Sequence, residues 1–172
     1  MKTRRFAAQA ALDTPLGPLR LAATEHGLAG AWFDGQAHHP GELDAPWDPA
    51  QPHLALAGRE LQAYFQGRAR AFTVPLDLAG TPFQAAVWQA LRDIPCGQLL
   101  SYGELACRVG RPQAMRAVGA AVGRNPVSVI VPCHRVVGSD GSLTGYAGGL
   151  ERKRALLAQE AAAGDRRARA TA

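Results

Sequence analysis

Two capping boxes in the second half of the sequence predict where helices begin, and they constrain the fold more than any other feature. In each box a Thr or Ser precedes a Gln or Glu by three residues: Thr81 with Gln84, and Ser101 with Glu104. These paired side chains satisfy backbone N–H groups that a helix leaves open in its first turn. We therefore expect one helix over residues 82–92 and a second from residue 102, which Gly110 ends.

A third helix is predicted over residues 113–124, directly after the tight turn Arg111-Pro112. Two short helices joined by a turn that contains glycine are typical of a helix-turn-helix. The sequence therefore predicts a helix-turn-helix between residues 102 and 124.

The remaining segments of the second half complete a winged-helix pattern. We expect a buried strand over 127–131, a hairpin over 135–146 with its turn at 138–141, and a last helix over 150–160. Three helices with a hairpin make a winged-helix domain. Residues 162–172 consist mostly of Ala and Arg, and we expect them to be disordered.

Short apolar runs broken by Gly and Pro fill the first part of the chain and predict a small antiparallel sheet. Its strands are expected over residues 8–12, 19–23 and 28–33. An irregular loop over 34–52 should lead to a helix over 53–66 and a short strand over 72–76. The boundary falls near residues 77–80. The sequence thus predicts an α+β protein with domains at 1–79 and 80–161.

The composition argues against a membrane protein and favours a polyanionic partner. No window approaches the roughly 18 uninterrupted apolar residues of a membrane span. The basic N-terminus is not followed by the apolar region of a signal peptide, so we expect a cytoplasmic protein. The formal net charge of +5 favours nucleic acid. Much of this charge lies in residues 152–154 and 166–169, and charge in such stretches is often only solvated.

The three cysteines predict reduced thiols rather than a disulfide framework or a zinc finger. Their number is odd and they form no CxxC pair: Cys96, Cys107 and Cys133. Cys96 has no base beside it in the sequence, and Cys107 lies in a predicted helix. We therefore expect Cys96 and Cys107 to be inert.

The predicted third helix has two faces of different character. One is apolar and is expected in the core; it consists of Met115, Val118 and Val122. The other has one long cation and otherwise no bulk; it consists of Arg116, Gly119, Ala120 and Gly123. A glycine inside a helix costs roughly 1 kcal/mol relative to Ala, so a close approach by another backbone should compensate. Tight helix packing is one interpretation. The helix-turn-helix favours the other, which is DNA contacted mainly by shape and phosphate.

The segment over residues 129–137, Val-Ile-Val-Pro-Cys-His-Arg-Val-Val, gives Cys133 the surroundings of a nucleophile. Cysteine reacts as the thiolate, and a neighbouring base or cation such as His134 or Arg135 favours that form. Because neighbours in an extended strand point to opposite faces, a turn at Pro132 is needed to bring His134 to the thiol. The alternative is an inert core cysteine beside a surface His-Arg pair.

The string Pro132-Cys133-His134-Arg135-Val136 resembles the active-site signature of the methylated-DNA–protein-cysteine methyltransferases, also called O6-alkylguanine-DNA alkyltransferases. Further segments also resemble conserved blocks of this family, in the same order and at similar spacing along the chain: 101–106, 116–119, 125–126 and 145–150. The resemblance covers residues 81–160 and is weaker over 1–80. It implies a ribonuclease H-like N-terminal domain and a C-terminal winged-helix domain.

The resemblance implies that Cys133 accepts the alkyl group of O6-alkylguanine, and possible substrates extend to O4-alkylthymine. His134 would act through a bound water as the base, and Glu160 would hold His134, in a relay similar in logic to a hydrolase triad. Tyr102 would donate a proton or hydrogen bond to the departing guanine. Asn125 would brace the turn that carries the active-site segment.

The resemblance also implies contacts with duplex DNA and with the flipped base. Arg116 would enter the base stack and fill the space of the extruded nucleotide, whose eversion costs a few kcal/mol. The other residues expected to contact DNA are Tyr102, Gly119, Ala120, Arg111, Arg135 and Ser139. The base pocket would be lined by Tyr146, Ala147 and Val136. Since a thioether is very stable, the reaction should be stoichiometric, with one protein molecule for each lesion.

Several further expectations follow from the residues that are present or absent. Some relatives carry a structural zinc held by Cys and His of the N-terminal domain; residues 1–80 here contain no cysteine, so we expect no metal. No cofactor is expected, and the protein should act as a monomer. Related proteins with Trp at the nucleophile position only bind lesions, whereas Cys133 predicts activity. Two alternatives remain: a winged-helix module that only binds alkylated DNA, and a cysteine hydrolase that uses Cys133, His134 and Glu160.

Overall fold

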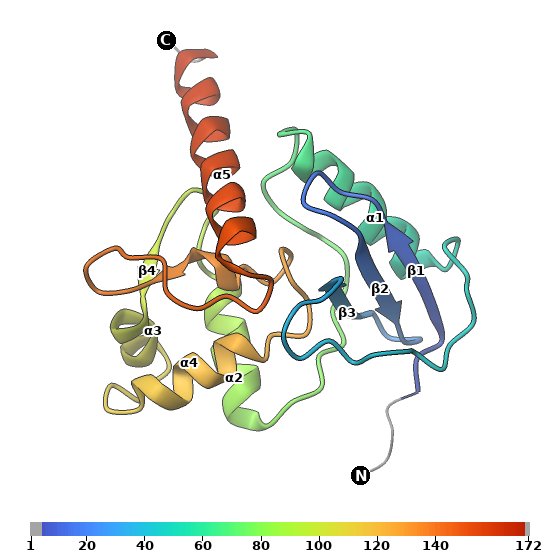
Figure 1. Cartoon of the computed structure of the whole chain (residues 1–172), viewed down its shortest axis with the longest axis horizontal. Coiled ribbons are helices and arrows are strands. Elements are labelled where there is room, and N and C mark those ends of the chain that lie inside the picture. Colours follow the sequence, from blue (N-terminus) through green and yellow to red (C-terminus); the bar gives the residue numbers. More distant parts are fainter. Residues whose placement is uncertain (1–4, 171–172) are drawn as a thin grey trace. The chain divides into compact units, whose positions relative to one another are not determined.

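The computed structural model describes residues 5–170, with side chains through residue 164, and the chain divides into two compact units (Figure 1). Unit 1 comprises Met1–Ala79 and Pro126–Ser128, and unit 2 comprises Gly80–Asn125 and Val129–Ala172. Unit 1 combines a small antiparallel sheet with a helix, and unit 2 is mainly helical. The α+β class predicted from the sequence is confirmed.

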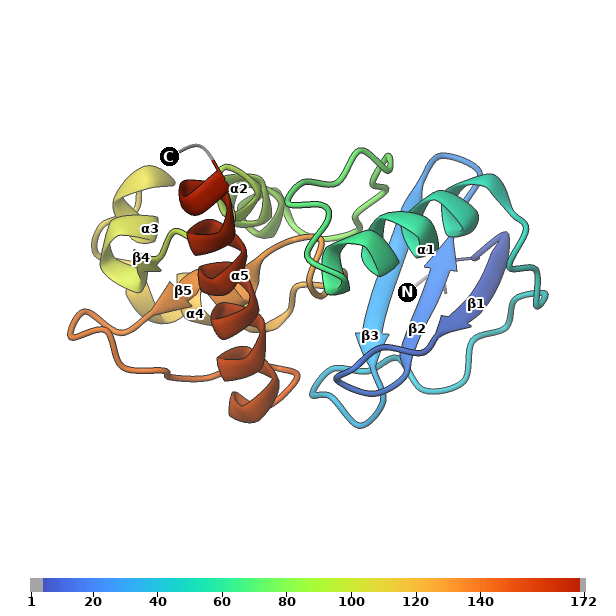
Figure 2. The ribbon, with the colours of Figure 1, turned by 90° about the horizontal axis from the view of Figure 1, so that it is seen from above.

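Unit 1 is built on three antiparallel strands in the order β1–β2–β3. Their bounds are Ala8–Leu12 for β1, Leu19–Ala23 for β2 and Leu28–Phe33 for β3, as predicted. The register pairs Leu12 with Leu19 and Leu19 with Phe33. Helix α1 (Pro52–Phe65) lies across one face of this sheet (Figure 2). The helix presents an apolar face that is buried: Leu54, Ala57, Leu61 and Tyr64.

The outer edge of β3 is covered by two separate segments of unit 1. At its start, the amide of Leu28 donates to the Pro75 carbonyl at 2.8 Å, and Leu28 forms a parallel bridge with Leu76. Further along, Ala31 forms a parallel bridge with Val127. These short bridges replace the strands that were predicted over 72–76 and 127–131, and both predictions are wrong. They leave β3 with no exposed pairing edge along these contacts, in agreement with its complete burial.

Unit 2 contains the three helices that the capping signals predict. They are α2 (Pro82–Arg92), α3 (Tyr102–Arg108) and α4 (Met115–Gly123). Both capping boxes are formed, and Gly110 stops α3 with a φ of 69°. Helix α4 packs on both α2 and α3. The indole N–H of Trp88 donates to the Ala121 carbonyl at 2.9 Å, which ties α2 to α4 through a buried hydrogen bond.

The wing of unit 2 differs from the predicted hairpin. Strand β5 (Val136–Val137) pairs in parallel with β4 (Leu100–Ser101), and no strand forms over 143–146. The turn is closed by the amide of Gly138, which donates to the Ser142 carbonyl at 2.9 Å. The segment after this turn therefore pairs with no strand, and the predicted hairpin is wrong.

Helix α5 (Leu150–Ala170) is longer than predicted. It continues past Glu160 through residue 170, so the disorder expected from residue 162 is not found over 162–170; residues 171–172 lie outside the described part. Its buried positions fall on one face: Lys153, Leu156 and Glu160. Two of these three are charged, so this face needs polar partners inside unit 2. No helix in residues 5–170 is long and apolar enough to cross a membrane.

Candidate active site

Cys133 sits immediately after the turn that the sequence requires at Pro132. Pro132 has φ −82° and ψ 61°, and the Cys133 amide donates to the Val131 carbonyl at 2.8 Å, which makes an inverse γ-turn. A single 3-10 turn, η1 (Cys133–Arg135), follows. Because of this turn, the side chains of Cys133 and His134 do not point to opposite faces as they would in an extended strand. Cys133 is only 4% exposed, so its sulfur is sheltered by the fold.

Asn125 holds this segment and touches the sulfur directly. Its side-chain amide donates to the Val131 carbonyl at 2.8 Å and to the Sγ of Cys133 at 3.1 Å. One buried side chain thus fixes the turn and offers a hydrogen bond to the thiolate. Val129, between them in sequence, has a φ of 72°, which is strained for a β-branched residue. The segment is therefore held in an unusual path that ends at the nucleophile.

The environment of Cys133 keeps the resting thiol protonated. Burial raises the pKa of Cys133 above its ordinary value. The hydrogen bond from Asn125 and the positive charge of Lys153 act in the opposite direction and favour the thiolate. The sulfur thus needs a base to ionise, and it has stabilising partners once it has done so.

His134 and Glu160 form a buried pair that can supply this base. The Nε2 atom of His134 lies 2.7 Å from Oε1 of Glu160. Burial lowers the pKa of His134, so the imidazole is neutral. Burial opposes ionisation of Glu160, but hydrogen bonds from His134 and Arg135 outweigh it and hold the Glu160 pKa well below its usual range. Nε2 therefore donates its proton to the carboxylate, and the buried Nδ1 carries an unprotonated lone pair with no hydrogen-bond partner among the described residues.

Arg135 belongs to this buried network and not to the surface. It is 5% exposed; Nε donates to Oε2 of Glu160 and an NH2 group to Oε1, both at 2.9 Å. Its NH1 group donates to the Ile94 carbonyl at 2.6 Å. The predicted DNA contact of Arg135 is contradicted by this burial. The guanidinium instead compensates the buried charge of Glu160 with two parallel hydrogen bonds.

Lys153 is a residue of the site that the sequence reasoning missed. Its side chain is fully buried, and its Nζ donates to the carbonyls of Val136 at 2.6 Å, Thr144 at 3.0 Å and Gly145 at 3.2 Å. The ammonium group therefore joins the end of β5 to the segment that follows the wing turn. Lys153 lies seven residues before Glu160 and therefore on the same face of α5, and this spacing could have indicated that Lys153 is also buried.

Tyr102 connects α3 to the same segment. Its hydroxyl donates to the Thr144 carbonyl at 3.3 Å, the carbonyl that also accepts from Lys153. Burial, and then the charge that Cys133 acquires on ionisation, raise the pKa of Tyr102, so the phenol remains a donor. The ring lies against Gly119 of α4, where an added Cβ would be 3.9 Å from it. Tyr102 thus packs against α4, and the charge of the Cys133 thiolate reaches its phenol.

The residues predicted to line a base pocket fall into two groups. Tyr146 and Ala147 are half-buried, and the Tyr146 carbonyl accepts from the Gly149 amide at 2.9 Å. Val136 is fully buried, so its side chain packs inside unit 2, and its predicted contact with a base stays a prediction. Its carbonyl is occupied by Lys153.

The exposed face of α4 has the composition that the sequence indicated. Arg116 and Ala120 are exposed, while Gly119 and Gly123 are half-buried. Arg116 makes no hydrogen bond or ion pair with the described part of the chain. Helix α4 also has no capping side chain, so its first N–H groups remain open. Outside this helix, Arg111 and Ser139 are exposed.

The apolar face of α4 is partly different from the prediction. Val118 and Val122 are buried as expected, together with Ala121. Met115 is 54% exposed, so its expected place in the core is wrong. The helix begins at Met115, and its core contacts begin only one turn later.

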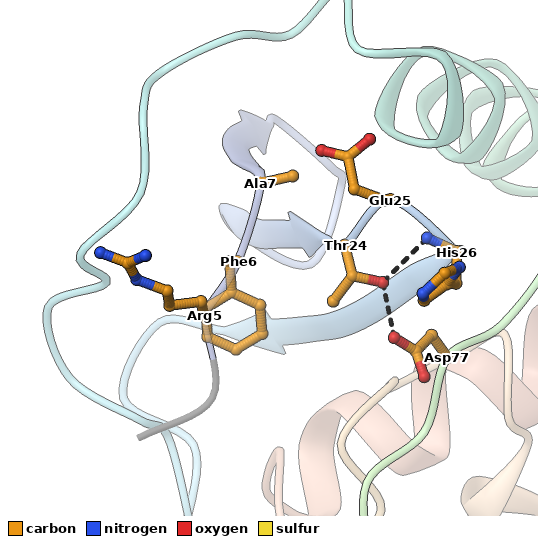
Figure 3. Close-up of a pocket in the computed structure, with 7 residues that line it drawn as sticks. All are labelled: Arg5, Phe6, Ala7, Thr24, Glu25, His26 and Asp77. Carbon is orange, nitrogen blue, oxygen red and sulfur yellow. Dashed lines mark hydrogen bonds between the residues drawn. The ribbon is translucent and has the colours of Figure 1, made fainter. Parts of the chain in front are cut away.

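Two other features of the described residues lie outside this arrangement. No group of three or more His, Cys, Asp or Glu side chains in residues 5–164 is placed to hold a metal ion. A cavity of about 420 Å³ in unit 1 contains none of the predicted site residues; Figure 3 shows the Thr24 hydroxyl within it, donating to Asp77 and accepting from the His26 amide.

Comparison with known proteins assigns both parts of the chain to one family. Residues 82–162 match the DNA-binding domain of 6-O-methylguanine DNA methyltransferase, and residues 9–78 match its ribonuclease-like domain. The chain belongs to the 6-O-methylguanine DNA methyltransferase family. The resemblance inferred from the sequence is thereby confirmed.

Individual members of this methyltransferase family align over most of their length. A methylated-DNA–protein-cysteine methyltransferase of Mycobacterium bovis is 48% identical over 149 residues, which cover 87% of this chain and 89% of the relative. One from Methanosarcina barkeri is 45% identical over 150 residues, 87% of this chain and 94% of the relative. Mycobacterium tuberculosis OGT, solved in complex with DNA, matches with a TM-score of 0.85 and 45% identity over 91% of this chain and 94% of that one.

Proposed function

We propose that this protein repairs duplex DNA by transferring the alkyl group of O6-alkylguanine to its own Cys133. The observation that carries the proposal is the buried pair of His134 and Glu160, whose geometry leaves the Nδ1 lone pair available beside the nucleophile's segment. The curated relatives bear the name methylated-DNA–protein-cysteine methyltransferase. Asn125, at 3.1 Å from the sulfur, adds a donor for the thiolate.

The proposed reaction is a direct displacement at the alkyl carbon. His134 Nδ1 takes the thiol proton through a bridging water molecule, and Glu160 stabilises the imidazolium that forms. The thiolate attacks the carbon attached to O6 of guanine; the S–C bond forms as the C–O6 bond breaks. The electron pair of that bond remains on the guanine, which takes up the proton released from the thiol. Tyr102 donates a hydrogen bond to the departing base, since its raised pKa keeps the phenol protonated.

This reaction consumes the protein. The product is a thioether, which neither water nor an imidazole base cleaves readily, so each chain acts once. One copy of the chain suffices for one lesion, and we expect a monomer to be the active form. Neither a metal nor a redox group is needed for the displacement, because the alkyl group moves with balanced atoms and electrons.

DNA is proposed to lie against the exposed face of α4. The small residues Gly119 and Ala120 allow a backbone to approach closely, and the open N–H groups at the start of α4 favour a phosphate. Arg116 extends from this face and would occupy the space of the flipped nucleotide. Since none of the small residues can distinguish base edges, contact depends on shape and phosphate. The same mode of contact would let the protein scan DNA of any sequence.

A mass measurement tests the proposal. The protein is incubated with a duplex that contains O6-methylguanine, and we expect a gain of about 14 Da, one methylene, located on Cys133. Cys133→Ser should gain nothing, while Cys107→Ser should gain the same mass as the native chain, because Cys107 is an exposed thiol on α3.

Other outcomes would reject alkyl transfer. Tight binding of the lesion duplex with no mass gain would make the protein a non-catalytic module that recognises alkylated DNA. Multiple turnover on a small ester that depends on Cys133 would make it a hydrolase.

A further inference from the structure

Met115 is a large apolar side chain that the structure leaves half outside the protein. It is the first residue of α4 and is 54% exposed. The inner face of the helix is completed without it by Val118, Ala121 and Val122. The side chain therefore contributes little to the core of unit 2, although the helical spacing of the sequence would place it there.

Its position on α4 relates Met115 to both Arg116 and Tyr102. Arg116 is the next residue and is exposed. Gly119 lies four residues further on, on the same side of the helix as Met115, and the Tyr102 ring lies against it. The sulfur of Met115 lies over Gly103, at 3.7 Å from the position that a Cβ there would take. Met115 and Gly119 together thus face the first turn of α3.

This arrangement places an apolar group next to a cation on the face proposed for DNA. A thioether side chain is flexible and polarisable, so it adapts to a flat aromatic surface. An apolar side chain such as Met, Leu, Ile or Phe can act as a wedge between base steps, which partly unstacks them and kinks the duplex.

We propose that Met115 is a second DNA-contacting residue, an apolar wedge that packs on the base step beside the nucleotide that Arg116 displaces. The inference rests on the proposed function and specifies how the duplex is opened. Met115 partly unstacks the neighbouring step, Arg116 fills the gap, and Tyr102 lies toward the thiol. The exposed thioether is then buried on DNA, which offsets part of the unstacking free energy.

Other exposed apolar side chains among the described residues lack this setting. They are Trp47, Leu99 and Leu150, and none belongs to α3 or α4. Trp47 is in unit 1, where the guanidinium of Arg20 lies 5.7 Å from its ring centre. It therefore offers a control in which an exposed apolar side chain is removed from the other unit, outside α3 and α4.

The experiment compares Met115→Ala, Met115→Leu and Trp47→Ala with the native protein. Single-turnover methyl transfer is measured on an O6-methylguanine duplex and on free O6-methylguanine base. A 2-aminopurine placed next to the lesion reports unstacking through its fluorescence. We expect Met115→Ala to slow the duplex reaction by about tenfold and to reduce the fluorescence rise, with the free-base reaction unchanged. Met115→Leu should restore both duplex signals, and Trp47→Ala should match the native protein.

The outcomes separate this inference from the proposed function. If native protein transfers no methyl group to Cys133 from either substrate, the proposed function fails. If native protein is active and Met115→Ala slows both substrates equally, the residue has a structural role and the wedge is rejected. The wedge is also rejected if Met115→Ala leaves the duplex rate and the fluorescence rise at native values.

Discussion

The Nε2 atom of His134 lies 2.7 Å from Oε1 of Glu160, and this buried contact determines which imidazole nitrogen is available as a base. A carboxylate can only accept a hydrogen bond, so Nε2 carries the proton and Nδ1 does not. Arg135 keeps Glu160 ionised from the other side. The pair therefore works as an oriented base and not as a permanent ion pair, since burial keeps the imidazole neutral.

Replacement of His134 by Gln should remove this base. We expect methyl transfer from an O6-methylguanine duplex to slow by roughly 10²- to 10⁴-fold near neutral pH, which is usual for loss of a general base. Single-turnover rates measured by mass spectrometry give the value.

The pH profile separates loss of the base from loss of structure. The His134 pKa is lowered from 6.5, so the native rate should decline only below that pH, where the imidazole becomes protonated. In His134→Gln the acid limb should vanish, and the rate should rise into the alkaline range because burial raises the pKa of the Cys133 thiol. Profiles of the same form in both proteins would contradict the role of His134.

Replacement of Arg135 by Lys tests whether this cation is structural or contacts DNA. The charge is retained, but one ammonium cannot reproduce the two parallel bonds to Glu160 and the bond to Ile94. We expect the free energy of unfolding to fall by about 1–3 kcal/mol. The dependence of DNA affinity on salt should remain native. Urea unfolding and binding titrations at several salt concentrations measure the two quantities, and a changed salt slope with native stability would return Arg135 to the DNA interface.

The parts of the fold that the sequence predicted are those with local signals. Each capping box lies within one turn of the helix it begins, so Thr81 and Ser101 mark α2 and α3 without reference to the rest of the chain. The turn at Pro132, which the sequence requires for His134 to reach the thiol, is also local, since the Cys133 amide and the Val131 carbonyl close it. The pairing of His134 with Glu160 came from the family resemblance, because these residues are far apart in sequence.

The parts that could not be predicted depend on contacts between distant segments. The charged residues around Lys153 in the sequence are typical of an exposed helix. Its burial is explained only by the carbonyls of Val136, Thr144 and Gly145, which accept its hydrogen bonds. In the sequence, Arg135 lies close to the nucleophile, which suggested a contact with a DNA phosphate. The structure shows that it instead bonds to Glu160, a residue distant in sequence. The segment after Val137 alternates like a strand, but β5 pairs with β4 instead.

Replacement of Lys153 by Met keeps the length of the side chain and removes its charge and donors. Three carbonyls then lose a donor, and that of Val136 is buried, so we expect the free energy of unfolding to fall by about 1–3 kcal/mol. Loss of the positive charge also raises the pKa of Cys133 further, so less thiolate forms near neutral pH and transfer should slow.

The neighbouring exposed cation on α5 provides the matched control. Arg154→Met removes the same charge from the chain but lies in solvent, so it should unfold and react like the native protein. Chemical unfolding and single-turnover rates are compared for both variants. If Lys153→Met behaves like Arg154→Met, the buried ammonium has no role in holding the segment or in favouring the thiolate.

Replacement of Arg116 by Ala tests the contact between α4 and the flipped nucleotide. The side chain is exposed and makes no bond within the described chain, so folding should be unaffected. Without it, the gap in the base stack is left unfilled, and reaction with an O6-methylguanine duplex should slow by at least about tenfold. Reaction with free O6-methylguanine should stay native, because no nucleotide must be displaced. Arg92→Ala, on the exposed surface of α2, serves as the control and should leave both rates unchanged. Equal losses on duplex and free base in Arg116→Ala would mean that Arg116 supports the active site itself, and that another group fills the stack.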